Sequence, residues 1–188
     1  MFETLIQKDR ELLIYLNNLG SEQWDSFWLF ITNQLNWAPL FALIIFLIFK
    51  NLGWKKGGFL LFFLILMVAF SDQFTNMIRG IFERLRPNND LRISHLLRTL
   101  ITPQSYSFTS GHATTSMAFS VFVWLFFKKR YKTIRLIFIF PLVFAYSRLY
   151  LGVHFPIDIL TGATIGSTIG YVFFKSHALL EKKLFPSA

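Results

Sequence analysis

The sequence has 188 residues, of which 54% are hydrophobic and 19% aromatic, whereas only 15% are charged. An average soluble domain carries roughly 25% charged residues, and uninterrupted apolar runs such as 58–70 and 118–127 leave no polar face for water. The composition therefore excludes a soluble protein and predicts an integral membrane protein. The chain contains no cysteine, which excludes a disulfide framework and a thiolate metal site.

The net charge of +9 is distributed in a way that favours a lipid bilayer over nucleic acid as the partner. Three groups of basic residues lie at the ends of apolar segments, which is the positive-inside pattern of membrane proteins. These residues are Lys50, Lys55, Lys56, Lys128, Lys129, Arg130, Lys132, Arg135, Lys175, Lys182 and Lys183.

Two amphipathic helices are predicted at the N-terminal end, over residues 2–18 and 22–35. Each has an apolar side and a polar side, which is typical of helices that lie in the membrane interface. The next apolar segment, 37–50, is shorter than the roughly 20 residues that a bilayer requires. The sequence therefore leaves open whether 22–50 forms one span or an interfacial helix followed by a span.

The apolar segments predict an all-α, polytopic membrane helix bundle of about five spans, preceded by the N-terminal interfacial amphipathic helices. One long polar connection, residues 84–110, interrupts the series, and a small interfacial helix is expected within it at 91–100. The five predicted spans are 37–50, 57–77, 111–127, 133–148 and 156–174.

The loops between these spans predict the orientation in the membrane. The lysine-rich loops 51–56 and 128–132 fall on the same side as the C-terminal tail, which predicts that this side is cytoplasmic. The loop 79–110 and the turn 147–158 fall on the opposite side. We therefore expect a protein of the bacterial cytoplasmic membrane whose polar motifs all face the periplasm.

The first polar cluster follows the outer end of the second predicted span. Asp72, Asn76 and Arg79 share one helix face, and Arg86-Pro87 ends the helical pattern seven residues after Arg79. A polar stripe on an apolar helix indicates a hydrated or protein-lined cavity. We expect Asp72 and Asn76 to support Arg79 or another polar group of the bundle, and contact with the substrate is the alternative. Taken alone, this cluster would be interpreted as arginines that flank a membrane span.

The second cluster, Thr109-Ser110-Gly111-His112, directly precedes an apolar helix. Ser110 is a good N-cap residue, and the free N–H groups at a helix start can bind an anion. Taken alone, a capped helix with an incidental histidine is the simpler interpretation.

The third cluster, Ser147-Arg148 followed by His154 and Asp158, lies between two strongly apolar segments. Charged residues at membrane depth are costly and indicate a functional site. Pro156 suits the first turn of a helix, and a carboxylate at Asp158 could accept a hydrogen bond from His154 and fix its tautomer.

Together the three clusters resemble the signature of the type 2 phosphatidic acid phosphatase family, membrane lipid phosphatases related to bacterial acid phosphatases and vanadium haloperoxidases. The family pattern is Lys-x6-Arg-Pro, Pro-Ser-Gly-His and Ser-Arg-x5-His-x3-Asp. The resemblance covers roughly residues 37–175, with Arg79 where Lys is usual and Thr109 where Pro is usual. The matching residues are Arg86-Pro87, Ser110-Gly111-His112, Ser147-Arg148, His154 and Asp158.

The resemblance implies a metal-independent phosphatase without a cofactor that works through a phosphohistidine. His154 would attack phosphorus, Asp158 would orient His154, and His112 would act as the general acid for the leaving oxygen. Five further residues would bind the phosphate oxygens, and these are Arg79, Arg86, Arg148, Ser110 and Gly111.

We expect a single domain over 1–188, with an interfacial segment 1–36, a catalytic bundle 37–175 and a cytoplasmic tail 176–188. The leading substrate is a polyprenyl pyrophosphate such as undecaprenyl pyrophosphate. Phosphatidylglycerophosphate, phosphatidic acid, diacylglycerol pyrophosphate and lipid A 1-phosphate remain alternatives. A transporter or binder of an anionic lipid is the non-enzymatic alternative.

Two features of the last predicted span lie outside these clusters. Gly162, Gly166 and Gly170 form a small-residue helix face, for which we expect close packing inside the bundle and keep a homodimer seam as the alternative. His177 lies beside Lys175 and is expected at the surface.

Overall fold

The structure is a computed structural model that describes residues 2–186, and within this range the chain contains helices and no strand. The predicted all-α fold is confirmed. The α-helices are α1 (Phe2–Asn18), α2 (Glu22–Thr32), α3 (Ala38–Phe82), α4 (Gly111–Phe127), α5 (Ile139–Tyr150) and α6 (Pro156–Leu184). Short 3-10 helices cover Gln34–Trp37, Pro87–Asn89, Ser94–Leu96 and Lys132–Phe138.

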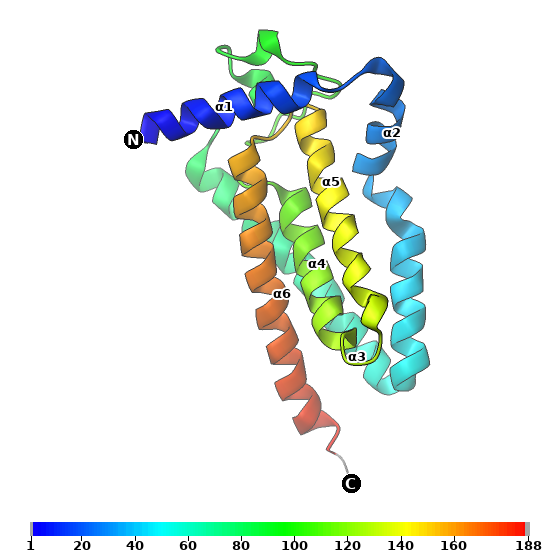
Figure 1. The fold of residues 1–188 in the computed structure, drawn as a ribbon. Coiled ribbons are helices and arrows are strands. Elements are labelled where there is room, and N and C mark those ends of the chain that lie inside the picture. Colours follow the sequence, from blue (N-terminus) through cyan, green and yellow to red (C-terminus); the bar gives the residue numbers. More distant parts are fainter. Residues whose placement is uncertain (1, 187–188) are drawn as a thin grey trace.

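The bundle is built around α4, which packs against α3, α5 and α6. These helices run side by side in Figure 1, while α1 lies across one end of the bundle, close to the loop that follows α3. The core between the helices is rich in phenylalanine. The helix α4 is apolar on all sides, as expected of a helix that is covered on all sides. Its most deeply buried side chains include Phe122, Phe127, Ile48, Leu60 and Met67.

A single glycine divides α3 into two arms. Gly53 has φ +68° and ψ −176°, a conformation that glycine adopts without the strain a side chain would cause. The chain reverses there, and Figure 1 shows the two arms running back along each other. The predicted segments 37–50 and 57–77 correspond to these arms, but the predicted turn 51–56 is helical except at Gly53.

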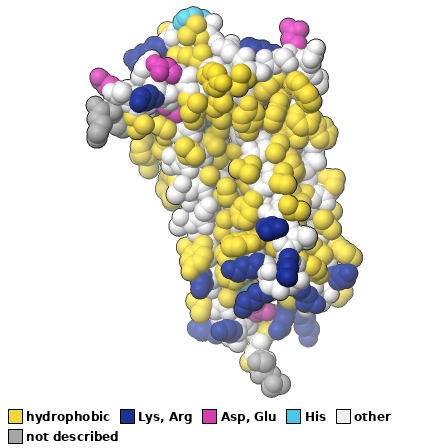
Figure 2. Space-filling model, viewed as in Figure 1, with side chains coloured by type: hydrophobic (Ala, Val, Ile, Leu, Met, Phe, Trp, Pro, Cys, Tyr) yellow, Lys and Arg dark blue, Asp and Glu magenta, His cyan; other side chains and the backbone are white. Residues whose placement is uncertain are grey.

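The lengths and surface of the helices fit a membrane. Three stretches are long and apolar enough to cross a bilayer, namely Gln34–Asn89, which contains both arms of α3, Lys132–Tyr150 and Pro156–Leu184, and α4 is a shorter apolar helix. In Figure 2 apolar side chains cover the flank of the molecule, and Lys and Arg gather at the end where the chain terminates.

The chain between 22 and 50 does not form one continuous helix. The helix α2 ends at Thr32, the backbone is extended at Asn33, and a 3-10 turn leads into α3. The side chain of Asn33 stabilises this break by accepting a hydrogen bond from the N–H of Leu35 at 3.0 Å.

The predicted helix 2–18 is present as α1, and its inward face carries two polar residues. Asp9, Leu13 and Asn17 recur every four residues and all three are buried. The side chain of Asn17 accepts a hydrogen bond from the N–H of Arg98 at 2.7 Å and donates to the carbonyl oxygen of Tyr150 at 2.7 Å. Hydrogen bonds therefore fasten α1 to the long loop and to the end of α5.

The glycine face of α6 packs against α4, which confirms the expected close packing inside the bundle. A Cβ on Gly166 would lie 2.2 Å from the carbonyl oxygen of Thr114, and one on Gly170 would lie 2.4 Å from that of Ala118. At Gly162 the corresponding distance to a backbone oxygen is 2.7 Å. A homodimer through these glycines is not supported, because α4 already occupies the face.

The long connection and the C-terminal end differ from the predictions. The expected helix at 91–100 is reduced to the 3-10 turn Ser94–Leu96. The helix α6 continues to Leu184, so most of the predicted tail 176–188 is helical. Residues 187 and 188 of that tail lie outside the described range.

His177 is buried and not at the surface as predicted. Its side chain is 1% exposed, because this side of α6 turns toward the aromatic core. The rings of Phe59 and Phe63 lie 5.1 and 5.3 Å from the imidazole ring.

Candidate active site

The three polar clusters predicted from the sequence meet in one cavity of about 860 Å³. Arginine and histidine side chains form its polar end, and the rest of its wall is mainly apolar and comes from both arms of α3, from α4 and from α5. The cluster residues that line the cavity are Asp72, Arg79, Arg86, Gly111, His112, Arg148 and His154.

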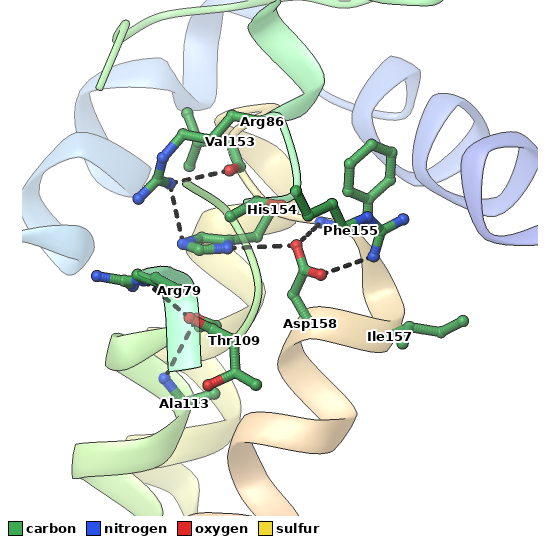
Figure 3. A network of polar contacts seen from close by, with 12 residues as sticks. Arg79, Arg86, Thr109, Ala113, Val153, His154, Phe155, Ile157 and Asp158 are labelled. Carbon is green, nitrogen blue, oxygen red and sulfur yellow. Dashed lines mark hydrogen bonds and ion pairs between the residues drawn. The ribbon is translucent and has the colours of Figure 1, made fainter. Parts of the chain in front are cut away.

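His154 lies in the turn between α5 and α6. Gly152 shapes this turn with φ +66°, and a Cβ there would also meet the carbonyl oxygen of Arg98 at 3.3 Å. Figure 3 shows the imidazole between an arginine and a carboxylate: Nε2 lies 3.0 Å from Nη1 of Arg86, and Nδ1 lies 3.5 Å from Oδ2 of Asp158. With the proton on Nδ1, the lone pair of Nε2 is directed toward the cationic end of the cavity.

The surroundings of His154 favour its neutral form. Burial, together with the positive charges of Arg86, Arg148 and Arg79, holds the pKa of His154 well below its ordinary value of 6.5. A neutral imidazole keeps the lone pair that a nucleophile requires. The same arginines form a site for an anion and would repel a metal cation.

Asp158 is held in the first turn of α6, which begins at Pro156. Its Oδ2 accepts a hydrogen bond from the N–H of Phe155 at 2.9 Å, and its Oδ1 accepts one from Nη1 of Arg84 at 2.7 Å. The hydrogen bond predicted from His154 is not formed: Nδ1 has no hydrogen-bond partner among the described residues. Oδ2 is directed to the backbone N–H, so the two side chains face each other at 3.5 Å as a close pair.

Arg86 is fixed by the backbone around it. Its Nε donates to the carbonyl oxygen of Ser105 at 2.6 Å, its Nη2 to the hydroxyl of Ser105 at 2.9 Å and its Nη1 to the carbonyl oxygen of Val153 at 3.0 Å. Because a guanidinium has five donors in a rigid plane, these bonds orient the remaining donors toward His154 and the cavity.

Arg79 joins the first cluster to the second. Its Nε donates to the carbonyl oxygen of Thr109 at 3.1 Å, and its Nη1 donates to Oδ1 of Asn76 at 3.2 Å. Asn76 in turn donates to Asp72 at 3.2 Å, which confirms the predicted support of Arg79 by these two residues. A Cβ on Gly111 would lie 3.2 Å from Nη2 of Arg79, so the glycine allows the guanidinium to approach the start of α4.

Ser110 is the N-cap of α4, as the sequence indicates. Its hydroxyl accepts a hydrogen bond from the N–H of Ala113 at 3.4 Å, and its own N–H donates to the carbonyl oxygen of Asp158 at 3.1 Å. Among the described residues, the cavity wall includes Gly111 but not Ser110. The N–H of Ser110 thus joins α4 to α6, and the role of its hydroxyl in binding phosphate stays a prediction.

The end of α2 adds a residue that the sequence analysis does not identify. The hydroxyl of Thr32 accepts a hydrogen bond from Nη1 of Arg148 at 2.5 Å, and its carbonyl oxygen lies 3.2 Å from Nε2 of His112. The ring of His112 also stacks on Phe144, with centroids 4.5 Å apart. Thr32 thus contacts the second and the third cluster at once.

Arg84 and Asp9 are also absent from the predicted site. Nη2 of Arg84 lies 2.7 Å from Oδ2 of Asp9, while its Nη1 holds Asp158. Burial raises the pKa of Asp9 above its ordinary value, although Arg84 and the N–H of Ile157 act in the opposite direction. An acidic residue on the buried face of α1, in line with Leu13, is the sequence signal that could have identified this contact.

A model of the PAP2 superfamily matches residues 60–181, a range that contains all three clusters. The chain belongs to the PAP2 superfamily. This finding confirms the family inferred from the clusters. The fold agrees as well, because a structure described as the first transmembrane PAP2 type phosphatidylglycerolphosphate phosphatase, from Bacillus subtilis, superposes with a TM-score of 0.73. It is 19% identical in sequence, and the match covers 98% of this chain and 90% of that one.

This PAP2 protein is similar to named phosphatases of other organisms. The "Lipid A 4'-phosphatase" of Bacteroides thetaiotaomicron is 33% identical over an alignment of 187 positions, which covers 97% of this chain and 83% of the relative. The "Undecaprenyl-diphosphatase" of Sulfolobus acidocaldarius is 30% identical over 136 residues, which is 72% of this chain and 61% of the relative. The chain is therefore a membrane lipid phosphatase of the PAP2 superfamily.

Proposed function

We propose that this PAP2 phosphatase removes a phosphate monoester group from lipid A. The observation that carries the proposal is the extent of its similarity to the Bacteroides relative, which covers 97% of the chain. That extent includes the N-terminal helices, which lie outside the matched family range of 60–181. Because Asp9 and Thr32 on these helices contact the site, the similarity covers the parts of the site that the three clusters do not define.

The shape and polarity of the cavity support a lipid phosphate as the substrate. Its polar end presents Arg79, Arg86 and Arg148 beside His154, and planar guanidinium groups suit phosphate oxygens. The wall beyond them is formed by apolar side chains such as Phe41, Leu64 and Val68. A phosphate can occupy the cationic end while acyl chains stay against apolar surface.

In the first step we assign the nucleophile to Nε2 of His154. Its lone pair attacks phosphorus, a P–N bond forms, and the bond between phosphorus and the leaving oxygen breaks. His112 gives a proton to that oxygen, so the lipid leaves as an alcohol. Asp158 stabilises the positive charge that develops on the imidazole of His154, from which its Oδ2 is 3.5 Å away.

In the second step water attacks the phosphohistidine. His112, now without its proton, accepts a proton from the water, the P–N bond breaks, and inorganic phosphate leaves. Arg79, Arg86 and Arg148 stabilise the negative charge on the transferring group in both steps. The residues that carry this chemistry are sufficient without a cofactor.

We also propose the placement in the membrane. The two arms of α3, the helix α4, the segment 132–150 and the helix α6 make five crossings, and α1 and α2 lie in the outer interface. The lysine-rich end in Figure 2 supports a cytoplasmic C-terminus and an active site that opens to the periplasm. A lipid held in the outer leaflet can then present its phosphate to the cavity.

Undecaprenyl pyrophosphate, the leading substrate expected from the sequence, is the second candidate. The relative from Sulfolobus acidocaldarius favours it, but that similarity covers a smaller share of both chains. A pyrophosphate would use the same histidine and leave a lipid monophosphate, whereas lipid A would lose a monoester phosphate from a sugar. The two candidates therefore differ in their lipid product.

Phosphate release by the purified full-length protein in detergent tests the proposal. Bisphosphorylated lipid A, undecaprenyl pyrophosphate, phosphatidylglycerophosphate and phosphatidic acid are compared in the presence of EDTA, and mass spectrometry identifies the lipid product. We expect the highest kcat/KM with lipid A and a product that lacks one sugar phosphate. Turnover of undecaprenyl pyrophosphate alone would transfer the assignment to the second candidate.

The matched variants His154→Ala and His95→Ala complete the test. His95 is an exposed histidine in the connection between α3 and α4 and does not line the cavity. We expect turnover to disappear in His154→Ala and to persist in His95→Ala, with phosphate trapped on the wild-type protein after an acid-free quench. Equal activity in both variants would refute the histidine mechanism.

A further inference from the structure

Arg84 makes a bridge between two buried carboxylates. Its Nη1 is 2.7 Å from Oδ1 of Asp158, and its Nη2 is 2.7 Å from Oδ2 of Asp9. The side chains of the two aspartates are 0% and 1% exposed. The guanidinium also lies 3.8 Å from the ring centroid of Phe155, so both of its ends and one of its faces are in contact.

Asp9 extends the bridge back to the start of α6. While Oδ2 binds Arg84, Oδ1 accepts a hydrogen bond from the N–H of Ile157 at 2.9 Å. That N–H is one of the free donors in the first turn of the helix, where a negative charge is favoured. Asp158 lies in the same turn of α6. Arg84 therefore contacts Asp158 itself, while Asp9 on α1 contacts the backbone of the turn that contains it.

Because of the bridge, the two oxygens of Asp158 make different contacts. Oδ1 is bound by Arg84, which leaves Oδ2 to accept the N–H of Phe155 and to face Nδ1 of His154. If Arg84 were removed, Oδ1 would lose its charged hydrogen bond from the guanidinium and the carboxylate could turn. A buried carboxylate oxygen without a partner also favours protonation, which would remove the charge that supports His154.

We propose that Arg84 and Asp9 are positioning residues for the Asp158–His154 pair, so that α1 contributes to the geometry of the active site. The inference rests on the proposed histidine mechanism and deepens it. Neither Arg84 nor Asp9 belongs to the three clusters, and neither lines the cavity. Their loss should therefore slow the chemical step and leave substrate binding largely unchanged.

Four variants test this inference in the purified full-length protein with the best lipid substrate. Arg84→Met should lower kcat by about 10²-fold, because the pair loses its alignment, while KM changes by less than about threefold. Arg84→Lys should recover part of this loss, since an ammonium can still bind one carboxylate. Asp9→Asn should lower kcat by about tenfold, since Arg84 keeps its charged hydrogen bond to Asp158.

The double variant separates positioning from simple stabilisation. If Asp9 acts through Arg84, adding Asp9→Asn to Arg84→Met lowers kcat no further. If the two residues only stabilise the fold, their effects multiply and follow the loss of thermal stability, which would overturn the inference. Asp9→Asn and Arg84→Lys retain polar side chains of similar size, so they keep the test usable if Arg84→Met does not fold.

Arg10 provides the matched control on the same helix. It pairs with Asp90 at 2.9 Å, in a partly buried ion pair between α1 and the long loop, and has no contact with Asp158. Arg10→Met should leave kcat unchanged. If wild-type turnover depends on His154 and kcat is unchanged in Arg84→Met, this inference alone is refuted. If turnover does not need His154, the proposed function itself is refuted.

Discussion

Replacing Gly166 with alanine tests whether the close contact between α4 and α6 sets the geometry of the active site. The added Cβ would lie 2.2 Å from the carbonyl oxygen of Thr114 and 3.1 Å from the backbone nitrogen of Ala118, whereas ordinary contact begins at 3.4 Å. The neighbouring atoms belong to the backbone, so no side chain can rotate away. The two helices must separate by roughly 1 Å to restore a normal contact.

Two opposing effects set the size of the change. Alanine favours a helix over glycine by about 1 kcal/mol, whereas overpacking a core costs about 1–3 kcal/mol and sometimes more. With a backbone clash this short we expect a net loss of about 1–2 kcal/mol, which corresponds to a fall in Tm of about 2–8 °C for a chain of this size. The separation also moves His112 on α4 away from Asp158 and the nearby His154, and a displacement of 1 Å can cost about 10²-fold in rate.

The assay combines thermal unfolding in detergent with kcat on the best lipid substrate. Gly58→Ala is the matched control, because a Cβ at Gly58 meets no atom within 4 Å. We expect Gly58→Ala to keep full activity and to raise Tm slightly. Equal Tm and kcat values in Gly166→Ala and wild type would refute the argument that this contact fixes the distance between the helices.

Three further predictions follow from the site and the core. The pKa of His154 lies well below 6.5, so the neutral nucleophile persists as the pH falls through 6.5, and the acid limb of kcat/KM that belongs to the enzyme should lie below that value. The pH profile is measured with two substrates whose phosphate groups have different pKa values. A limb that belongs to the enzyme has the same midpoint pH with both substrates, and such a limb above pH 6.5 would contradict the prediction. Thr32→Val removes the oxygen that accepts from Arg148 but keeps the carbonyl near His112, so kcat/KM should fall by about tenfold while Tm changes little; unchanged kinetics would show that Arg148 needs no support from α2. His177→Phe should preserve both activity and Tm, because Nε2 of His177 has no hydrogen-bond partner among the described residues and the ring lies in an aromatic core; a clear loss of stability in thermal unfolding would assign the imidazole a structural role.

The parts of the molecule that the sequence predicts well are those encoded locally. The apolar segment 111–127 coincides with α4, and Ser110 directly before it is the N-cap, because a helix start depends on its own neighbouring residues. The three clusters converge because each lies at the same end of a predicted span. Within the first cluster, the spacing of Asp72, Asn76 and Arg79 places them on one helix face and predicts their contacts.

The contacts that sequence reasoning misses join distant positions. Asp9 and Ile157 are 148 residues apart, and Thr32 and Arg148 are 116 residues apart. No periodicity or motif links such pairs, since the contact depends on how α1 and α2 fold back over the bundle. The wrong expectation for His177 has a similar cause. A polar residue beside Lys175 suggests a surface, and only the packing of α6 against the arm of α3 shows that this face is covered.

The long sequence separation between Asp9 and its partners also determines when their contacts can form during synthesis. The helix α1 is synthesised before its partners, since Arg84 and Ile157 are made 75 and 148 residues after Asp9. Contacts of such long range close late in folding because a large loop must be ordered to form them. The helix α1 therefore takes its final place only after the start of α6 has been synthesised, and the nascent phosphatase cannot gain its full catalytic geometry before that point.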